Sequence, residues 1–407
     1  MNKNYLKELL LIGNGLGQIG SSVLSFALGL YIFKVLNSVF LYSLSQIIAP
    51  LVALLLLPIL GSIVDKFNRN KIIKFSQFAS CIALVLFYLL NGENEVNFAN
   101  IVVLLIILKI SDQFLSTTLT ASTSSLINEK NIQSFRSHLQ LIQAASMILS
   151  PIIAVFIYDK LSIAGAVIIS AVIEFFVLII FWNIDFKYNK IKNSTNNSLL
   201  FMFKEGMKFI FSYKKIIFGM LFVLVINFIV GVINVGLPYL QIQVLKFSNT
   251  AYAINDSIFA IGLILGALIT TTINTSTKLR FARYSIILMG IVTLILSGLL
   301  GLDFSNNTWY FVIAMYSMSI ALFMTIGNIL LSSWSMIKIP KEFQGRVFAI
   351  LNTVTQITMP LSILIYGYMF ARLDAGIIFF VSAGMLLIVS IPIPGIFKIN
   401  LANDELE

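Results

Sequence analysis

Long apolar runs, interrupted by short polar segments, set the pattern of this chain. A helix needs about 20 apolar residues to cross the hydrocarbon core of a bilayer. Runs of that kind fall near residues 9–33, 41–64, 72–91, 99–120, 139–158 and 163–183, and again near 215–238, 253–273, 284–302, 308–331, 347–370 and 376–397. The pattern predicts an all-α membrane protein with about twelve transmembrane helices, arranged as two six-helix bundles.

A polar interval separates the two groups of runs. Residues 184–213 contain several lysines and the Asn/Ser-rich stretch 193–198, which is typical of a solvated linker. We therefore expect an N-terminal bundle over residues 1–183, a cytoplasmic linker over 184–213 and a C-terminal bundle over 214–407. The fifth run of each group begins near an arginine and contains a proline, as Arg136 with Pro151 and Arg346 with Pro360, which favours a transporter built from repeats.

Composition and charge support this picture. Hydrophobic residues make up 58% of the chain and charged residues 11%, a balance that excludes a soluble domain of this length. The net charge of +10 does not indicate nucleic-acid binding, because the basic residues punctuate the apolar runs and form no continuous patch.

The basic residues also predict the orientation of the chain. If both termini are cytoplasmic, the opposite side receives only Lys34, Lys160, Lys246 and Arg372, and Lys109 lies within a helix. All the other Lys and Arg residues then fall on the cytoplasmic side, as the positive-inside rule requires. The first run follows a charged N-terminus without a cleavage site, so we expect a retained first helix.

The sequence gives little support for an enzyme. The chain has one cysteine, Cys81, and one histidine, His138, so we expect no disulfide, no metal site and no cofactor. Phosphate-loop, serine-hydrolase and zinc-protease signatures are absent from the sequence. We also find no pore-loop segment of the kind that a channel uses.

Three ionisable residues lie within the apolar runs and are candidates for proton coupling or a charged cavity. Lys109 and Asp112 are three residues apart in the run 99–120 and share one face of a helix, while Glu174 stands alone in the run 163–183. A charge near mid-bilayer costs at least about 2.5 kcal/mol unless it is paired or faces water. We expect these groups to face a water-filled cavity, although a static pair that holds helices together is the alternative.

Neutral polar residues continue this pattern at helical spacing. They predict a substrate cavity or, alternatively, polar contacts between helices. The candidates for the cavity are Asn14, Gln18, Gln113, Asn227, Asn234, Asn328 and Gln356.

The segment between the second and third runs carries the strongest local signal. Its sequence, Gly61-Ser-Ile-Val-Asp65-Lys66-Phe-Asn-Arg69-Asn-Lys71, resembles the G-x-x-x-D-[RK]-x-x-[RG]-[RK] signature of the major facilitator superfamily, with Asn70 in place of one cation. The resemblance implies a gate, in which Asp65 pairs with Arg69 and with the start of the eleventh helix. A helix start carries about half a positive charge, which favours such a carboxylate contact.

Further resemblance extends over most of the chain. The stretch from Pro340 through Gly345 and Arg346 to Ala349 is similar to a segment of the macrolide-efflux and siderophore-exporter branch, and it places the start of the eleventh helix near Gln344. Ser150-Pro151 stands where exporters of the superfamily carry a Gly-Pro pair. The resemblance implies a cavity surrounded by the first, fourth, seventh and tenth helices.

Together these observations predict a secondary active transporter of a bacterial inner membrane. We expect a monomer that exports a small, hydrophobic, drug-like molecule of macrolide type by alternating access and proton antiport. The alternatives are the export of a siderophore or another metabolite, and a lipid flippase of the same fold.

Overall fold

The computed structural model describes residues 3–92, 96–126, 129–184, 186, 207–272 and 279–396. Within its helices, the side chains of Gly61, Asp65, Lys66, Gly345 and Arg346 lie outside the described part of the chain. Regular structure in the described ranges is entirely helical. The chain divides into two compact units, Met1–Asn193 and Ser194–Glu407, each described by itself below.

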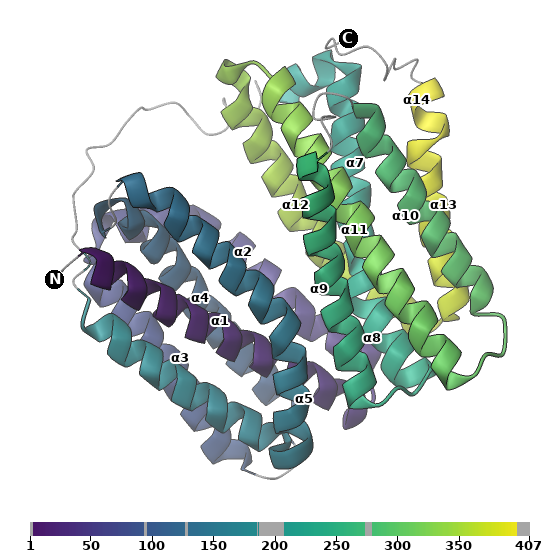
Figure 1. Cartoon of the computed structure of the whole chain (residues 1–407). Coiled ribbons are helices and arrows are strands. Elements are labelled where there is room, and N and C mark those ends of the chain that lie inside the picture. Colours follow the sequence, from purple (N-terminus) through teal and green to yellow (C-terminus); the bar gives the residue numbers. More distant parts are fainter. Residues whose placement is uncertain are drawn as a thin grey trace. The chain divides into compact units, whose positions relative to one another are not determined.

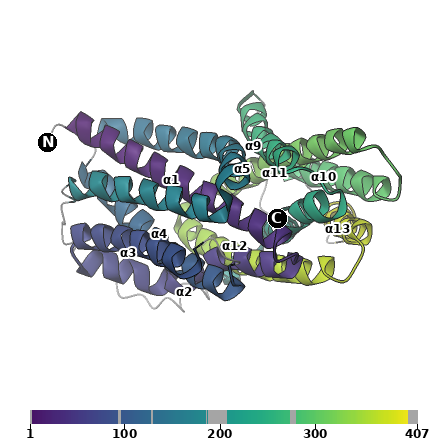
Figure 2. The same ribbon diagram turned by 90° about the horizontal axis from the view of Figure 1, so that it is seen from below.

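The N-terminal unit consists of long helices that run side by side in both views (Figures 1 and 2). They are α1 (Lys3–Lys34), α2 (Val39–Lys66), α3 (Arg69–Asn91), α4 (Phe98–Leu126) and α5 (Glu129–Trp182). The backbone of α5 is interrupted at Ser162, where φ is 57°. Its largely apolar stretch His138–Trp182, 45 residues long, is long enough for two crossings, so the unit has the six expected spans.

The first spanning segment of the C-terminal unit is one helical stretch of mixed type. It contains α7 (Lys214–Gly231), the π-helix η1 (Val232–Gly236), α8 (Leu237–Tyr239) and the π-helix η2 (Leu240–Val244). The helices that follow are α9 (Asn249–Thr272), α10 (Leu279–Leu299), α11 (Asn306–Lys338), α12 (Lys341–Phe370), α13 (Ala375–Ser390) and the short α14 (Pro392–Ile396). The prediction of an all-α membrane protein with two groups of six helices is confirmed.

The eleventh helix begins three residues before the expected start near Gln344. This helix is α12, and it begins at Lys341 directly after Pro340, whose backbone is extended. Proline has a fixed φ and no N–H, so it is well placed ahead of a first turn. Gly345 and Arg346 therefore lie inside the helix and not at its start, because the helix continues beyond the apolar run that predicted it.

Close helix packing depends on small residues in both units. In the N-terminal unit, a Cβ at Gly13 of α1 would lie 2.5 Å from the Phe181 ring of α5. In the C-terminal unit, a Cβ at Gly262 of α9 would lie 2.5 Å from the Met318 carbonyl oxygen of α11, and one at Gly266 would lie 2.6 Å from that of Leu322. Such spacing of glycines lets helix backbones approach within a membrane.

Candidate functional site

A polar cavity of about 260 Å³ lies inside the N-terminal unit. Four helices contribute to it, and all of them are in long stretches apolar enough to span a membrane. The residues that line it are Gly13, Asn14, Gly17, Gln18 and Ser21 of α1, Gln77 of α3, Lys109, Asp112, Gln113, Leu115, Ser116 and Leu119 of α4, and Glu174, Val177 and Phe181 of α5. The structure therefore brings together six predicted site residues: Asn14, Gln18, Lys109, Asp112, Gln113 and Glu174.

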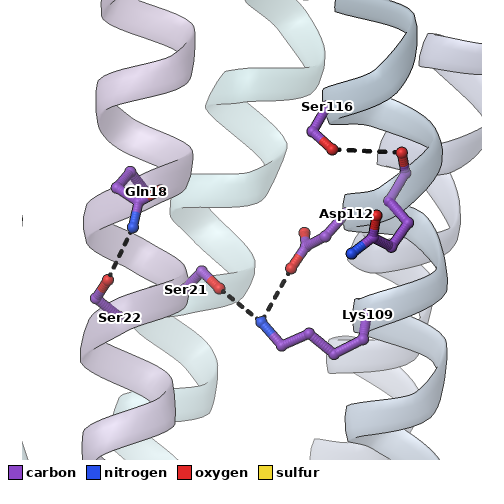
Figure 3. Close-up of polar contacts among 7 residues, drawn as sticks. Gln18, Ser21, Ser22, Lys109, Asp112 and Ser116 are labelled. Carbon is purple, nitrogen blue, oxygen red and sulfur yellow. Dashed lines mark hydrogen bonds and ion pairs between the residues drawn. The ribbon is translucent and has the colours of Figure 1, made fainter. Parts of the chain in front are cut away.

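An ion pair on α4 forms the charged part of this cavity. Lys109 Nζ lies 3.1 Å from Asp112 Oδ2, and the two side chains are 23% and 39% exposed. Lys109 Nζ also donates a hydrogen bond to Ser21 Oγ of α1, at 3.4 Å, so the ammonium lies between the two helices (Figure 3). The spacing of three residues predicts this pair correctly, because such side chains are neighbours on a helix.

The opposite face of α4 is apolar and exposed. It carries Val103, Ile107 and Ile110, and in a bilayer such side chains face lipid. α4 therefore has one polar face that lines the cavity and a separate apolar, exposed face, as expected of a helix placed between lipid and a polar cavity.

Glu174 lies across the cavity on α5. Its carboxylate accepts a hydrogen bond from Gln77 Nε2 of α3, and Gln77 itself is 1% exposed. Glu174 is also within electrostatic range of Asp112 and Lys109. Lys109, Asp112 and Glu174 therefore interact electrostatically with one another. The neutral amide of Gln77 contacts the Glu174 carboxylate.

The amide side chains on the polar face of α1 form hydrogen bonds within their own helix. Asn14 Nδ2 donates to the Leu10 carbonyl oxygen at 2.7 Å, and Gln18 Nε2 donates to Ser22 Oγ at 3.3 Å (Figure 3). A Cβ at Gly17 would meet nothing within 4 Å. This side of the cavity is therefore open and polar without a charge of its own.

The predicted gate lies at the start of α3. Arg69 is buried there and Lys71 is exposed, while the side chains of Gly61, Asp65 and Lys66 are outside the described residues. Asn70, the departure from the family signature, accepts a hydrogen bond from the Phe186 backbone N–H at 2.7 Å. This contact ties the start of α3 to the segment after α5.

The cavity candidates of the C-terminal unit lie on four different helical segments, α7, η1, α11 and α12. Asn227 Nδ2 donates to the Val223 carbonyl oxygen of its own helix at 2.8 Å, and Asn234 lies in the first π-helix. Asn328 is exposed on α11. Gln356 Oε1 is buried and has no hydrogen-bond partner among the described residues. None of these four residues lines the N-terminal cavity.

Two residues escaped the sequence analysis. Gln77 is an isolated amide in the run 72–91, and its partner Glu174 is 97 residues away, so no local pattern could connect them. Asp256 is a partly buried carboxylate in the spanning helix α9. The three consecutive polar residues from Asn255 to Ser257 were the available signal for it.

Comparisons with known proteins agree with this architecture. The family model described as Major Facilitator Superfamily matches residues 10–359. The chain is 24% identical over 405 residues to Macrolide efflux protein A of Streptococcus pyogenes, covering 95% of each chain. It is also 24% identical over 323 residues to the protein of the same name from Enterococcus faecalis, covering 75% of this chain and 94% of the relative.

A solved structure of the nucleoside transporter NupG shares the fold. It superposes with a TM-score of 0.72 at 13% identity, covering 98% of this chain and 100% of the other. The match to the family model spans most of the two units described above. This chain is therefore a multi-pass membrane transporter of small molecules and belongs to the major facilitator superfamily.

Proposed function

We propose that the protein is a secondary active exporter of a small, hydrophobic, drug-like molecule, of the macrolide type that its relatives' names indicate. The observation that carries this proposal is the cavity of the N-terminal unit, where Lys109, Asp112 and Glu174 meet inside spanning helices. Charged groups in such helices are costly and rare, and they commonly mark substrate or ion pathways.

The lining of the cavity supports an amphipathic substrate. Asn14 and Gln18 provide amide groups on one wall, and Leu115, Val177 and Phe181 provide apolar surface on others. Pockets for small molecules combine an apolar lining with a few polar groups in this way. Asn227, Asn234, Asn328 and Gln356 of the C-terminal unit are further candidates for substrate contact in this proposal.

Export is coupled to protons in this proposal, with Asp112 or Glu174 as the carboxylate that binds the proton. A carboxylate inside a spanning helix changes its interaction with a nearby ammonium when it is protonated. The two bundles then alternate access to the site, and the loop around Asp65, with Arg69 and Lys71, closes the cytoplasmic side. We place the monomer in a bacterial inner membrane with both termini in the cytoplasm.

Inverted membrane vesicles test the coupling. Erythromycin, a macrolide, is offered outside the vesicles, and its uptake is followed while an imposed pH gradient is acid inside. We expect uptake by the wild type to collapse when a protonophore is added. Asp112→Asn or Glu174→Gln should abolish the gradient-driven part, and retention by both variants would exclude proton coupling through these groups.

A lipid flippase or a siderophore exporter would give another outcome. Purified protein in proteoliposomes is tested with erythromycin, with a labelled phospholipid and with a polyanionic siderophore. Movement of erythromycin alone supports the proposal, because Lys109 is the one cation among the described residues that line the cavity, whereas a polyanion would need several. Movement of lipid or siderophore without erythromycin would overturn it.

A further inference from the structure

Asp256 of α9 is a carboxylate that plays no part in the site described above. In the apolar runs of the C-terminal half it is the single acidic residue. The one basic residue in these runs is Lys215, at the first position of the run 215–238. The C-terminal spans therefore contain a negative charge well inside one helix, with no basic residue at a comparable position in any other.

The Asp256 carboxylate forms no hydrogen bond or ion pair with any residue that the structure describes. The carboxylates of the N-terminal cavity differ in this respect. Asp112 pairs with Lys109, and Glu174 accepts a hydrogen bond from Gln77. A carboxylate inside a spanning helix is costly unless it is paired or faces water. Asp256 is therefore available to a ligand of opposite charge.

Asp256 lies away from the exposed apolar face of its helix. That face carries Ile254, Ile261 and Leu265, and such side chains face lipid in a bilayer. At about 100° per residue, Asp256 is about 140–200° round the helix from these three residues. The Asp256 side chain is nevertheless partly exposed. Its carboxylate is therefore accessible from a side of α9 other than the lipid-facing one.

The helices of the same unit leave this side of α9 open. Among the described helices, α9 packs along α11, as both views show (Figures 1 and 2), and it has only a short contact with η2. Gly262 and Gly266 make the close contact with α11, and they lie about 80–120° round the helix from Asp256. The carboxylate is therefore on neither the lipid-facing side nor the packed side of α9.

Apolar residues continue the side of α9 that carries Asp256. Ala260, Leu263 and Ala267 follow it after four, seven and eleven residues, a spacing that keeps side chains on one face of a helix. Leu263 and Ala267 are partly exposed. A carboxylate at one end of an apolar stripe suits a molecule that has an amine at one end of an apolar body.

We propose that Asp256 binds the cationic group of the substrate. The carboxylate accepts a charge-assisted hydrogen bond from a protonated amine, and the apolar body of the substrate lies along Ala260, Leu263 and Ala267. This inference rests on the proposed export function and specifies its substrate class as an amphipathic molecule with one positive charge. The bound cation supplies the opposite charge that the described residues around Asp256 do not provide.

Two ligands that differ in charge test this assignment. Erythromycin carries a single dimethylamino group, which is protonated near neutral pH. In N-demethyl-N-acetylerythromycin an amide replaces this amine, so the molecule is neutral. Binding of each tritiated compound to the detergent-purified protein is measured by scintillation proximity. We expect the wild type to bind erythromycin at least about tenfold more tightly than the neutral derivative, since hydrogen bonds to charged groups are the stronger ones.

Asp256→Asn removes the charge and keeps the shape of the side chain. We expect this variant to bind erythromycin at least about tenfold more weakly than the wild type, and to bind the neutral derivative within about twofold of the wild type. Asp256→Glu keeps the charge and should keep the preference for erythromycin. Thermal midpoints of both variants show that they are folded.

Asp303→Asn is the matched control. Asp303 is an exposed residue of the same unit, in the segment between α10 and α11, so its substitution changes the net charge by the same amount. This variant should bind both compounds as the wild type does. An equal loss of erythromycin binding in Asp303→Asn and Asp256→Asn would overturn the assignment, because the effect would then come from net charge alone.

The results separate the substrate class from the function on which it rests. If the wild type neither binds nor transports erythromycin, the proposed function is wrong and the inference fails with it. If the wild type transports erythromycin but binds both compounds equally well, the inference is wrong and the export function stands. The same conclusion follows if Asp256→Asn weakens the binding of both compounds equally or of neither. The comparison on the wild type needs no variant, so it decides even if Asp256→Asn does not fold.

Discussion

Gln77 of α3 donates a hydrogen bond through Nε2 to the carboxylate of Glu174 on α5. The same nitrogen lies 3.3 Å from the Glu174 carbonyl oxygen. Gln77 is almost completely buried, whereas Glu174 lines the cavity. The amide thus fixes the orientation of a carboxylate inside a membrane-spanning helix without adding a charge.

Gln77→Leu should lower the stability of the protein. The substitution removes the donor and leaves the Glu174 carboxylate with an unmet acceptor, which costs about 1 kcal/mol or more. In the double variant Gln77→Leu with Glu174→Met the loss should be smaller than in Gln77→Leu alone, because no unpaired polar group remains. Thermal unfolding of the detergent-purified protein measures this, and strictly additive losses would show that the two side chains are not coupled.

Replacing one residue of the Lys109–Asp112 pair should lower the stability of the protein more than replacing both residues. Lys109→Met or Asp112→Leu leaves a single charge in a spanning helix, and we expect a loss of about 1–2 kcal/mol after allowing for the partial exposure of both side chains. The double variant Lys109→Met with Asp112→Leu should regain stability but not transport. Thermal midpoints and erythromycin uptake, measured on the same preparations, separate the effect on stability from the effect on transport. Normal transport by the double variant would show that the ion pair has only a structural role.

Filling the cavity should block transport without disturbing the fold. Gly17 lines the cavity, and a Cβ there meets nothing within 4 Å, so Gly17→Leu places its side chain in the open space. We expect gradient-driven erythromycin uptake to fall at least about tenfold with an unchanged thermal midpoint. At Gly384 of α13 a Cβ also meets nothing within 4 Å, so Gly384→Leu serves as the control and should transport normally; equal activity of both variants would argue against the cavity as the substrate site.

The close contact between α9 and α11 should not tolerate a methyl group. A Cβ at Gly262 or Gly266 would meet backbone oxygens of α11, which move only with the helix itself. Gly262→Ala and Gly266→Ala should each destabilise the protein by about 1–3 kcal/mol.

Gly298→Ala is the matched comparison for these two variants. A Cβ added at Gly298 meets nothing within 4 Å, and alanine forms helices better than glycine. The thermal midpoint of this variant should therefore equal that of the wild type or be slightly higher. Equal midpoints for all three alanine variants would contradict the close packing.

Part of the candidate site could be predicted from spacing alone. Lys109 and Asp112 are three residues apart, so the period of a helix places them side by side before any tertiary contact forms. The same period places Asn14 and Gln18 on one face of the first helix. Glu174 was identified by its cost in a bilayer, a property of the residue type and its apolar surroundings.

Other contacts could not be predicted, because they join residues far apart in the chain. Gln77 meets Glu174, and Asn70 meets Phe186, across 97 and 116 residues. The polar cavity likewise depends on side chains from four helices that are far apart in the sequence. No periodicity encodes such distances.

The sequence by itself determined the apolar spans, their division into two groups of six and the presence of charges among them. These follow from the length of a bilayer-crossing helix and from the cost of charge in hydrocarbon, both of which act on each segment separately. Tertiary structure decided which polar side chains meet and where the polar cavity lies. These features arise only when helices pack, since the close approach of backbones at residues such as Gly13 and Gly262 fixes the neighbours of every side chain.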